Sequence, residues 1–135
     1  MRHVFKTNTM KINPNAPAIC LWVLLIGKYG NVDRLRAALD TGATYTIIPW
    51  DVAEILGYDP AKSRRTIPIT TASGRIDAPI ITVREIRVLS IKKKNIDVAV
   101  HDLPPETNID ALLGLDFLRG FVTTIDLIDG KLNIE

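Results

Sequence analysis

Short apolar and β-branched segments recur along the whole chain, and turn-forming residues separate them. Strands repeated at spacings of about 8 to 12 residues are typical of all-β barrels and sandwiches. Only two stretches, 51–56 and 115–119, suit short helices. The expected strands cover residues 19–26, 32–39, 45–48, 64–71, 75–83, 86–91, 96–101, 111–113, 122–127 and 131–134. The sequence therefore predicts an all-β barrel or sandwich with one or two short helices.

Composition limits the function classes that need to be considered. The chain has 135 residues, of which 47% are hydrophobic and 24% charged, so it suits one globular domain rather than a disordered segment. Its net charge of +2 gives little attraction for nucleic acid or for an anionic membrane. A single cysteine, Cys20, and two distant histidines, His3 and His101, provide no disulfide framework and no spaced metal pair. We expect no cofactor and no metal.

The N-terminal region differs in composition from the rest of the chain. Residues 1–17 are polar and rich in Pro and Asn, which predicts a loosely ordered arm before a domain at 18–135. The longest apolar run, 18–27, is too short for a membrane-spanning helix, which needs about 20 residues, and lies late for a signal peptide. We therefore interpret this run as a buried strand, and expect a cytoplasmic protein without a membrane partner.

One short motif carries the chemistry. Asp40, Thr41, Gly42 and Ala43 directly follow an apolar strand, where an unpaired carboxylate would be costly unless it is hydrogen-bonded or functional. Gly42 lacks a side chain, so its N–H can face the carboxylate, and Thr41 supplies a hydroxyl for a neighbour. A second apolar segment that ends at a glycine, Ala111–Gly114, lies downstream.

These residues resemble the signatures of the retropepsin-like (retroviral-type) aspartic proteases. Leu39–Ala43 looks like their active-site motif, and Leu112–Leu118 resembles their second signature, a hydrophobic-hydrophobic-glycine segment followed by a helix. The stretch from Leu112 to Leu132 is especially similar to the cellular branch found in ubiquitin-shuttling, damage-inducible proteins. The resemblance covers roughly residues 19–134 and implies a closed or partly open acid-protease β-barrel.

Peptide hydrolysis by this chemistry needs two aspartates. Two carboxylates held side by side share one proton, so that one activates water while the other hydrogen-bonds the scissile carbonyl. The chain has one Asp-Thr-Gly, because Asp129-Gly130 lies in a hairpin turn instead. The second acid must then come from another copy, which predicts a homodimer with Asp40 on its two-fold axis. In the family, Thr41 would bond across this axis and terminal strands would interleave, a role open to Lys131–Ile134.

A glycine-tipped hairpin falls where the family has its flap. We expect its tip to hold a peptide or protein substrate against the floor by strand-like pairing. Pockets would be apolar, with contributions from Ile69, Ile80 and Leu113. Ala43 has no hydroxyl with which to stabilise an ionised carboxylate, so we expect weakly acidic to neutral working pH. The expected substrate-binding residues are Ala43, Thr71, Ala72, Ser73, Gly74 and Leu113.

Two other function classes remain open at this point. A catalytically silent dimer could keep the fold and bind peptide without cleaving it. Nucleic-acid binding through Arg64, Arg65, Arg84, Arg87 and the lysines is disfavoured by the small net charge and an aromatic content of 6%.

Several further residues have structural interpretations. Asp116 suits the first turn of a helix rather than catalysis. Lys92–Lys94 suits a solvated hairpin tip between the expected strands 86–91 and 96–101. Cys20 and His101 suit structural positions.

Overall fold

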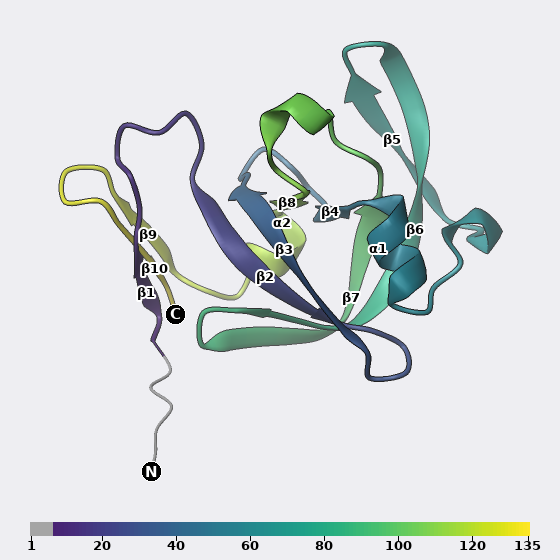
Figure 1. Cartoon of the computed structure of the whole chain (residues 1–135), viewed down its shortest axis with the longest axis horizontal. Coiled ribbons are helices and arrows are strands. Elements are labelled where there is room, and N and C mark those ends of the chain that lie inside the picture. The colour runs from purple at the N-terminus through teal and green to yellow at the C-terminus, as the bar shows by residue number, and fades with distance from the viewer. Residues whose placement is uncertain (1–6) are drawn as a thin grey trace.

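The computed structural model describes residues 7–135, so the predicted arm lies partly outside the described residues. Its elements are β1 (Thr9–Lys11), β2 (Cys20–Ile26), β3 (Val32–Leu39), β4 (Ile47–Ile48), α1 (Trp50–Ile55), β5 (Thr66–Thr71), β6 (Gly74–Val88), β7 (Ile91–Val100), β8 (Ala111–Leu113), α2 (Leu115–Leu118), β9 (Thr123–Asp126) and β10 (Lys131–Ile134), with 3-10 turns at Pro60–Lys62 and Pro105–Thr107. The predicted all-β class with two short helices is confirmed (Figure 1). No helix among the described residues is long and apolar enough to cross a membrane.

Six strands close into a barrel in the order β2, β3, β8, β4, β7 and β6. Closure comes from β2, whose residues Leu24–Ile26 pair with Glu85–Arg87 of β6. Two of the neighbouring pairs, β3 with β8 and β4 with β7, are parallel. Because β3 and β8 run in the same direction, their C-terminal ends lie side by side at one end of the barrel, although the two strands are distant in the sequence.

The barrel interior is filled by alternate side chains of these strands. Leu25, Val83, Val98 and Leu113 are fully buried there, and Phe117 of α2 packs against them. Strands that present every second side chain inward are typical of small closed barrels. This packed core holds β3 and β8 in place, and the candidate site lies at the ends of these two strands.

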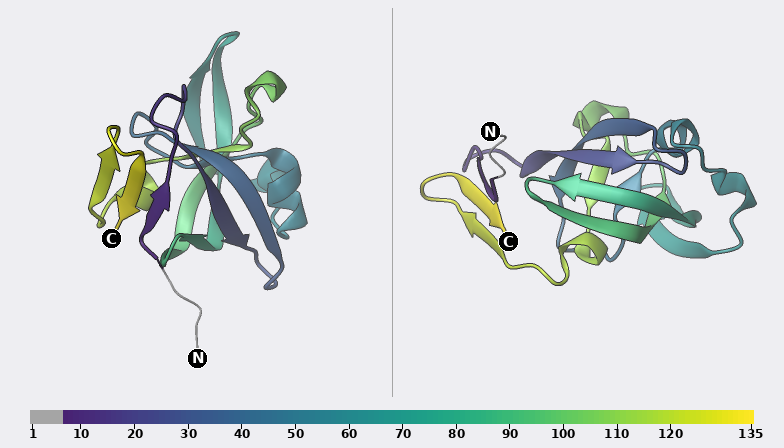
Figure 2. Two further views of the ribbon diagram at one scale, coloured as in Figure 1. Left: turned by 60° about the vertical axis from the view of Figure 1, so that its left-hand side comes forward. Right: turned by 90° about the horizontal axis from the view of Figure 1, so that it is seen from below.

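Two structures extend beyond the barrel. The β5–β6 hairpin projects from one end, where β5 pairs only with the first half of β6 (Figure 1). At the other side lies a separate three-stranded sheet in the order β1, β10, β9 (Figure 2). Part of the predicted arm, Thr9–Lys11, is therefore paired with β10 in this sheet.

One predicted hairpin is wrong. Instead of two strands flanking a tip at residues 92–95, β6 runs without interruption to Val88 and β7 begins at Ile91. The turn is at Leu89-Ser90, with Leu89 in the left-handed region at φ 52°. No glycine or asparagine marks this tight turn in the sequence, whereas Asn95 suggested one that does not form. The predicted strand 45–48 is also shorter, because only Ile47–Ile48 pairs as β4.

Candidate active site

The parallel pairing of β3 with β8 places Asp40 at the barrel end. Leu39 lies opposite Leu113, and the Asp40 N–H donates to the Leu113 carbonyl at 3.0 Å. The two glycine-terminated apolar segments that are distant in the sequence are thus neighbours in the fold. Their contact fixes where the chain leaves β3 and therefore where the Asp40 carboxylate begins.

The turn after Asp40 directs backbone N–H groups back toward it. Gly42 N–H donates to Asp40 Oδ1 at 2.9 Å, and Ala43 N–H donates to the Asp40 carbonyl at 3.2 Å. A Cβ on residue 42 would lie 3.2 Å from that carboxylate oxygen, which explains why glycine suits this approach. Asp40 is half-buried, while Thr41 and Gly42 are exposed. Among the described residues the Thr41 hydroxyl has no hydrogen-bond partner, so it is available to a molecule outside the chain.

Two hollows border Asp40. One, of about 330 Å³, lies between the Asp40 loop and β5 of the projecting hairpin. The other, of about 460 Å³, lies beside the segment before β2 and the β9–β10 turn, and includes Leu112 and Leu127. In the part of the chain that the structure describes, Asp40 is the only acidic residue lining either hollow. The site therefore contains one carboxylate between two concave surfaces.

The predicted substrate-binding residues fall into two groups. Ala43 lines the hollow beside β5, together with Ile69. Leu113 is completely buried in the core, as is nearly all of Ile80, so neither side chain faces the hollow, whereas the neighbouring Leu112 borders Asp40 from the other side.

The other predicted substrate-binding residues, Thr71–Gly74, form the tip of the projecting hairpin. The Thr71 hydroxyl donates to the Gly74 carbonyl at 2.7 Å and accepts from the Ser73 N–H at 3.2 Å. Gly74 has φ 115°, a conformation that side chains rarely adopt. These contacts stabilise a tight tip, and leave Ala72 and Ser73 exposed.

Sequence reasoning missed the role of Asp116. Its half-buried carboxylate accepts from Thr46 N–H at 2.9 Å and from the Thr46 hydroxyl at 2.7 Å, as well as from Phe117 N–H. Burial raises the pKa of the Asp116 carboxyl above its usual value, while the hydrogen bonds from Thr46 and Phe117 oppose that rise. Asp116 thus joins α2 to the loop that follows Asp40. A threonine six residues after the aspartate was the available signal.

Lys93 also differs from its predicted role as part of a solvated tip. Its ammonium donates to the carbonyls of Asp116 at 2.9 Å and Arg119 at 2.5 Å, and lies 5.5 Å from the centroid of the Phe121 ring. Partial burial lowers the pKa of Lys93 below its usual value. Because β7 is a barrel strand, this contact attaches α2 to the barrel wall.

An ion pair stabilises the base of the projecting hairpin. Arg65, just before β5, donates to both carboxylate oxygens of Asp97 on β7, at 2.7 and 3.1 Å. The Thr82 hydroxyl donates to the same carboxylate at 2.6 Å. The hydrogen bond from Arg65, and to a smaller extent that from Thr82, lowers the pKa of the Asp97 carboxyl.

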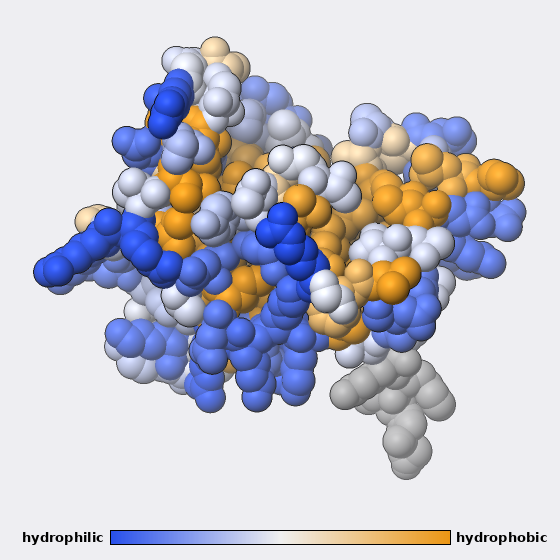
Figure 3. Space-filling model, turned by 180° about the vertical axis from the view of Figure 1, so that it is seen from behind, coloured by the Kyte–Doolittle hydropathy of each residue, from blue (hydrophilic) through white to orange (hydrophobic). Residues whose placement is uncertain are grey.

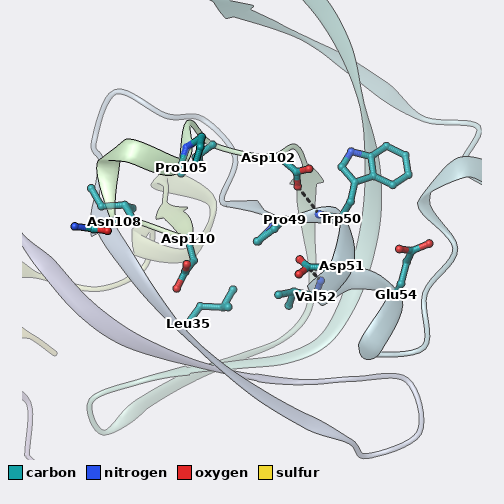
Figure 4. A pocket seen from close by; sticks show the side chains of 12 residues that line it. Leu35, Pro49, Trp50, Asp51, Val52, Glu54, Asp102, Pro105, Asn108 and Asp110 are labelled. Atoms are coloured by element: carbon teal, nitrogen blue, oxygen red, sulfur yellow. Dashed lines mark hydrogen bonds between the residues drawn. The ribbon is translucent and has the colours of Figure 1, made fainter.

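A hollow of about 820 Å³, larger than those beside Asp40, lies between α1 and residues 102–110 (Figure 4). Asp102 accepts from the Trp50 N–H, Asp51 from the Val52 N–H and Asp110 from the Arg36 N–H, so three of its carboxylates have local structural partners. Asp40 is not among its lining residues. Within residues 7–135 no group of three or more His, Cys, Asp or Glu side chains could hold a metal ion.

Two solved structures resemble this fold. A crystal structure of a retropepsin-like aspartic protease from Rickettsia conorii aligns with a TM-score of 0.67 and 26% identity, over 98% of this chain and all of that one. The EIAV protease complexed with the inhibitor HBY-793 aligns with a TM-score of 0.53 and 21% identity, over 76% of this chain and 86% of that one, which supports the fold alone.

Sequence comparison leads to the same group. An uncharacterised protein encoded in the 5′ region of cobV in a Sinorhizobium species is 33% identical over 81 residues, or 59% of this chain. The match covers only 34% of that relative. The sequence model of the aspartyl protease family matches residues 26–117, which include both Asp40 and Gly114. With its six-stranded barrel and the retropepsin-like structures that resemble it, the chain belongs to the aspartyl protease family, in its retropepsin-like form.

Proposed function

We propose that this chain is an aspartic endopeptidase whose active form is a homodimer. The observation that carries the proposal is the position of Asp40. Its half-buried carboxylate accepts from the Gly42 N–H and lies between two hollows. Among the described residues, no other acidic side chain lines either hollow. The ionised carboxylate would take a proton from water, and the protonated Asp40 of the second copy would hydrogen-bond the peptide carbonyl. The hollow beside β5 gives an extended peptide a place along the projecting hairpin.

The surface that would receive the second copy is the sheet of β1, β10 and β9. Within this chain β10 pairs with β1 on one side and β9 on the other, so we place the contact with the second copy at an outer strand of this sheet rather than at Lys131–Ile134. Within the described residues the outer strands β1 and β9 each have one free edge, and the β9 edge is the one flanked by exposed apolar residues. An unpaired strand edge is a template for pairing with another chain.

Exposed apolar side chains surround that edge. Val122, Ile125, Leu127 and Ile128 are all exposed, Ile128 by 91%. Figure 3 shows hydrophobic side chains gathered at the end of the molecule that carries this hairpin. Leu127 also lines the hollow that contains Asp40, so a copy that covers the hairpin comes close to the carboxylate. Burial of such side chains is the main driving force for stable association.

The direct test of activity is Asp40→Asn. The asparagine keeps an oxygen that can accept from Gly42 N–H, so the fold and the dimer should persist, while kcat/KM on a mixed peptide library should fall at least ~1000-fold. Cleavage sites would be read by mass spectrometry at several pH values. Asp59→Asn is the matched control, since Asp59 is exposed just before the turn Pro60–Lys62 and lines neither hollow beside Asp40. Binding without cleavage by wild type would favour the silent peptide-binding dimer, and equal cleavage by Asp40→Asn would refute the proposal.

The proposed dimer surface has its own test. Ile128→Asp places a charge on the exposed hairpin, and sedimentation should show a dimer dissociation constant raised at least ~10-fold, with activity lost in proportion. Tyr29→Asp is the control, because Tyr29 is 76% exposed but lies in the β2–β3 turn. Unchanged association of Ile128→Asp would show that another surface is used.

A further inference from the structure

The loop from Asp40 to Thr46 lies directly on the segment Leu113–Asp116. The N–H groups of Leu115 and Asp116 donate to the carbonyls of Ala43 and Thr44, at 2.8 and 3.1 Å. The Asp40 N–H donates in the opposite direction, to Leu113. Backbone hydrogen bonds thus connect the Asp40 loop to the end of β8 and to the start of α2.

Thr46 lies at the centre of this contact. Only 2% of its surface is exposed, and its hydroxyl donates to Asp116 Oδ1 while accepting from the Gly114 N–H at 3.0 Å. Its own N–H lies 2.9 Å from both carboxylate oxygens of Asp116. We name these three residues, Thr46, Gly114 and Asp116, the Thr46 cluster.

The backbone of the Asp40 loop packs against Gly114 without room for a side chain at that position. A Cβ on Gly114 would lie 2.8 Å from the Ala43 carbonyl oxygen and from the carbonyl carbon and oxygen of Tyr45. The Asp116 carboxylate accepts from the Thr46 N–H, the Thr46 hydroxyl and the Phe117 N–H, so three donors hold its orientation. Lys93 in turn binds the backbone carbonyl of Asp116, which joins the cluster to β7.

Only one of the hydrogen bonds to the Asp116 carboxylate comes from its own helix. The others come from Thr46, in the loop that begins at Asp40. A carboxylate that served α2 alone would have no reason to accept from a residue distant in the chain. The partner that it orders is the loop that carries the proposed catalytic group.

We infer that Asp116 is a positioning residue that acts through Thr46 to hold the Asp40 carboxylate in its working geometry. The inference rests on the proposed function, because it assigns Asp116 a part in the same reaction. Displacements of about 1 Å caused by changes away from the reacting atoms can lower rates about 100-fold. Loss of the cluster should therefore lower kcat rather than weaken peptide binding.

The test compares Thr46→Val with Thr46→Ser, together with Asp116→Ala and Asp116→Asn. Valine has the shape of threonine but no hydroxyl, whereas serine keeps the hydroxyl that donates to Asp116. For Thr46→Val and Asp116→Ala, kcat per folded dimer should fall roughly 10- to 100-fold with KM within about 3-fold of wild type. Thr46→Ser should stay within about 3-fold in kcat, and Asp116→Asn, which keeps one acceptor oxygen, should be intermediate.

Amide hydrogen exchange gives a second readout that does not depend on activity. In Thr46→Val and Asp116→Ala the amides of Asp40 and Thr46 should exchange at least ~10-fold faster, while amides in the paired strands β6 and β7 keep wild-type rates. Faster exchange throughout the barrel would indicate general loss of stability and would overturn the inference. If Thr46→Val or Asp116→Ala prevents folding, Thr46→Ser and Asp116→Asn, which retain part of the hydrogen bonding, provide the folded variants for comparison.

The two readouts separate the two proposals. If wild type cleaves peptides but Thr46→Val keeps wild-type kcat and exchange at Asp40, the positioning role is wrong and the proposed function survives. If no protein cleaves peptide, the proposed function fails, and local exchange at Asp40 alone decides whether Asp116 orders its loop.

Discussion

Substitution of Gly114 by alanine should disturb the site through one methyl group. The new Cβ would lie 2.8 Å from backbone atoms of Ala43 and Tyr45, whereas ordinary contacts begin at 3.4 Å. The Asp40 loop must then move by about 0.6 Å, a shift resisted by its hydrogen bonds to Leu115 and Asp116. Overpacking of this kind costs about 1–3 kcal/mol, and the strained hydrogen bond from Gly114 to Thr46 adds about 1 kcal/mol.

The expected loss of about 2–4 kcal/mol corresponds to a fall of roughly 6–15 °C in the unfolding midpoint of a domain of this size. Thermal unfolding should be followed at one fixed protein concentration, because association shifts the midpoint. Peptide cleavage should fall together with stability, because the displaced loop carries Asp40.

Gly120→Ala is the control for adding a methyl group to a glycine. Gly120 has φ 90° and open space around the new Cβ, so it should lose about 1–2 kcal/mol of stability without losing kcat. A Gly114→Ala protein with a midpoint within about 2 °C of wild type and normal kcat would refute the close packing of the Asp40 loop on α2.

Three further predictions use other parts of the fold. Ala43→Ser should move the pH optimum of peptide cleavage downward, because a hydroxyl beside Asp40 favours the ionised carboxylate; an unchanged pH profile would contradict this. Asp97→Asn should lower the free energy of unfolding above about pH 4, and the difference from wild type should close at lower pH. The reason is that the Arg65 contact lowers the pKa of Asp97 in the folded state, so its stabilisation is lost as the carboxyl is protonated. A pH-independent difference in chemical denaturation would exclude this explanation. Lys93→Met should cost about 1–3 kcal/mol in the same assay, because it leaves the carbonyls of Asp116 and Arg119 without their donor, whereas Lys94→Met on the exposed face of β7 should cost less than about 0.5 kcal/mol.

The sequence allowed the alternating strands and the position of Asp40 to be predicted, because both depend on local patterns. Cys20–Ile26 and Val32–Leu39 matched expectation almost residue for residue, since apolar segments bounded by turn residues have few alternatives. The turn at Leu89-Ser90 escaped prediction because tertiary pairing of β6 with β7, rather than turn-forming residues, determines it.

The parts of the candidate site that depend on distant contacts could not be predicted. Asp116 has the local signature of a helix first turn, and only the fold shows that Thr46 donates to it. Leu113 and Leu112 are equally apolar in sequence, yet the register of β8 buries one and leaves the other beside Asp40. Likewise, only the fold shows that β1 pairs with β10 and that β1 and β9 are the outer strands of this sheet.

Mixing wild-type chains with Asp40→Asn chains tests the proposed shared active site most directly. Peptide hydrolysis is measured at constant total concentration after the chains have exchanged partners. If each site needs Asp40 from both copies, activity follows the square of the wild-type fraction, so an equal mixture retains about a quarter of the activity. Activity that falls in simple proportion to the wild-type fraction, with about half retained in the equal mixture, would mean that one chain suffices and would contradict the account.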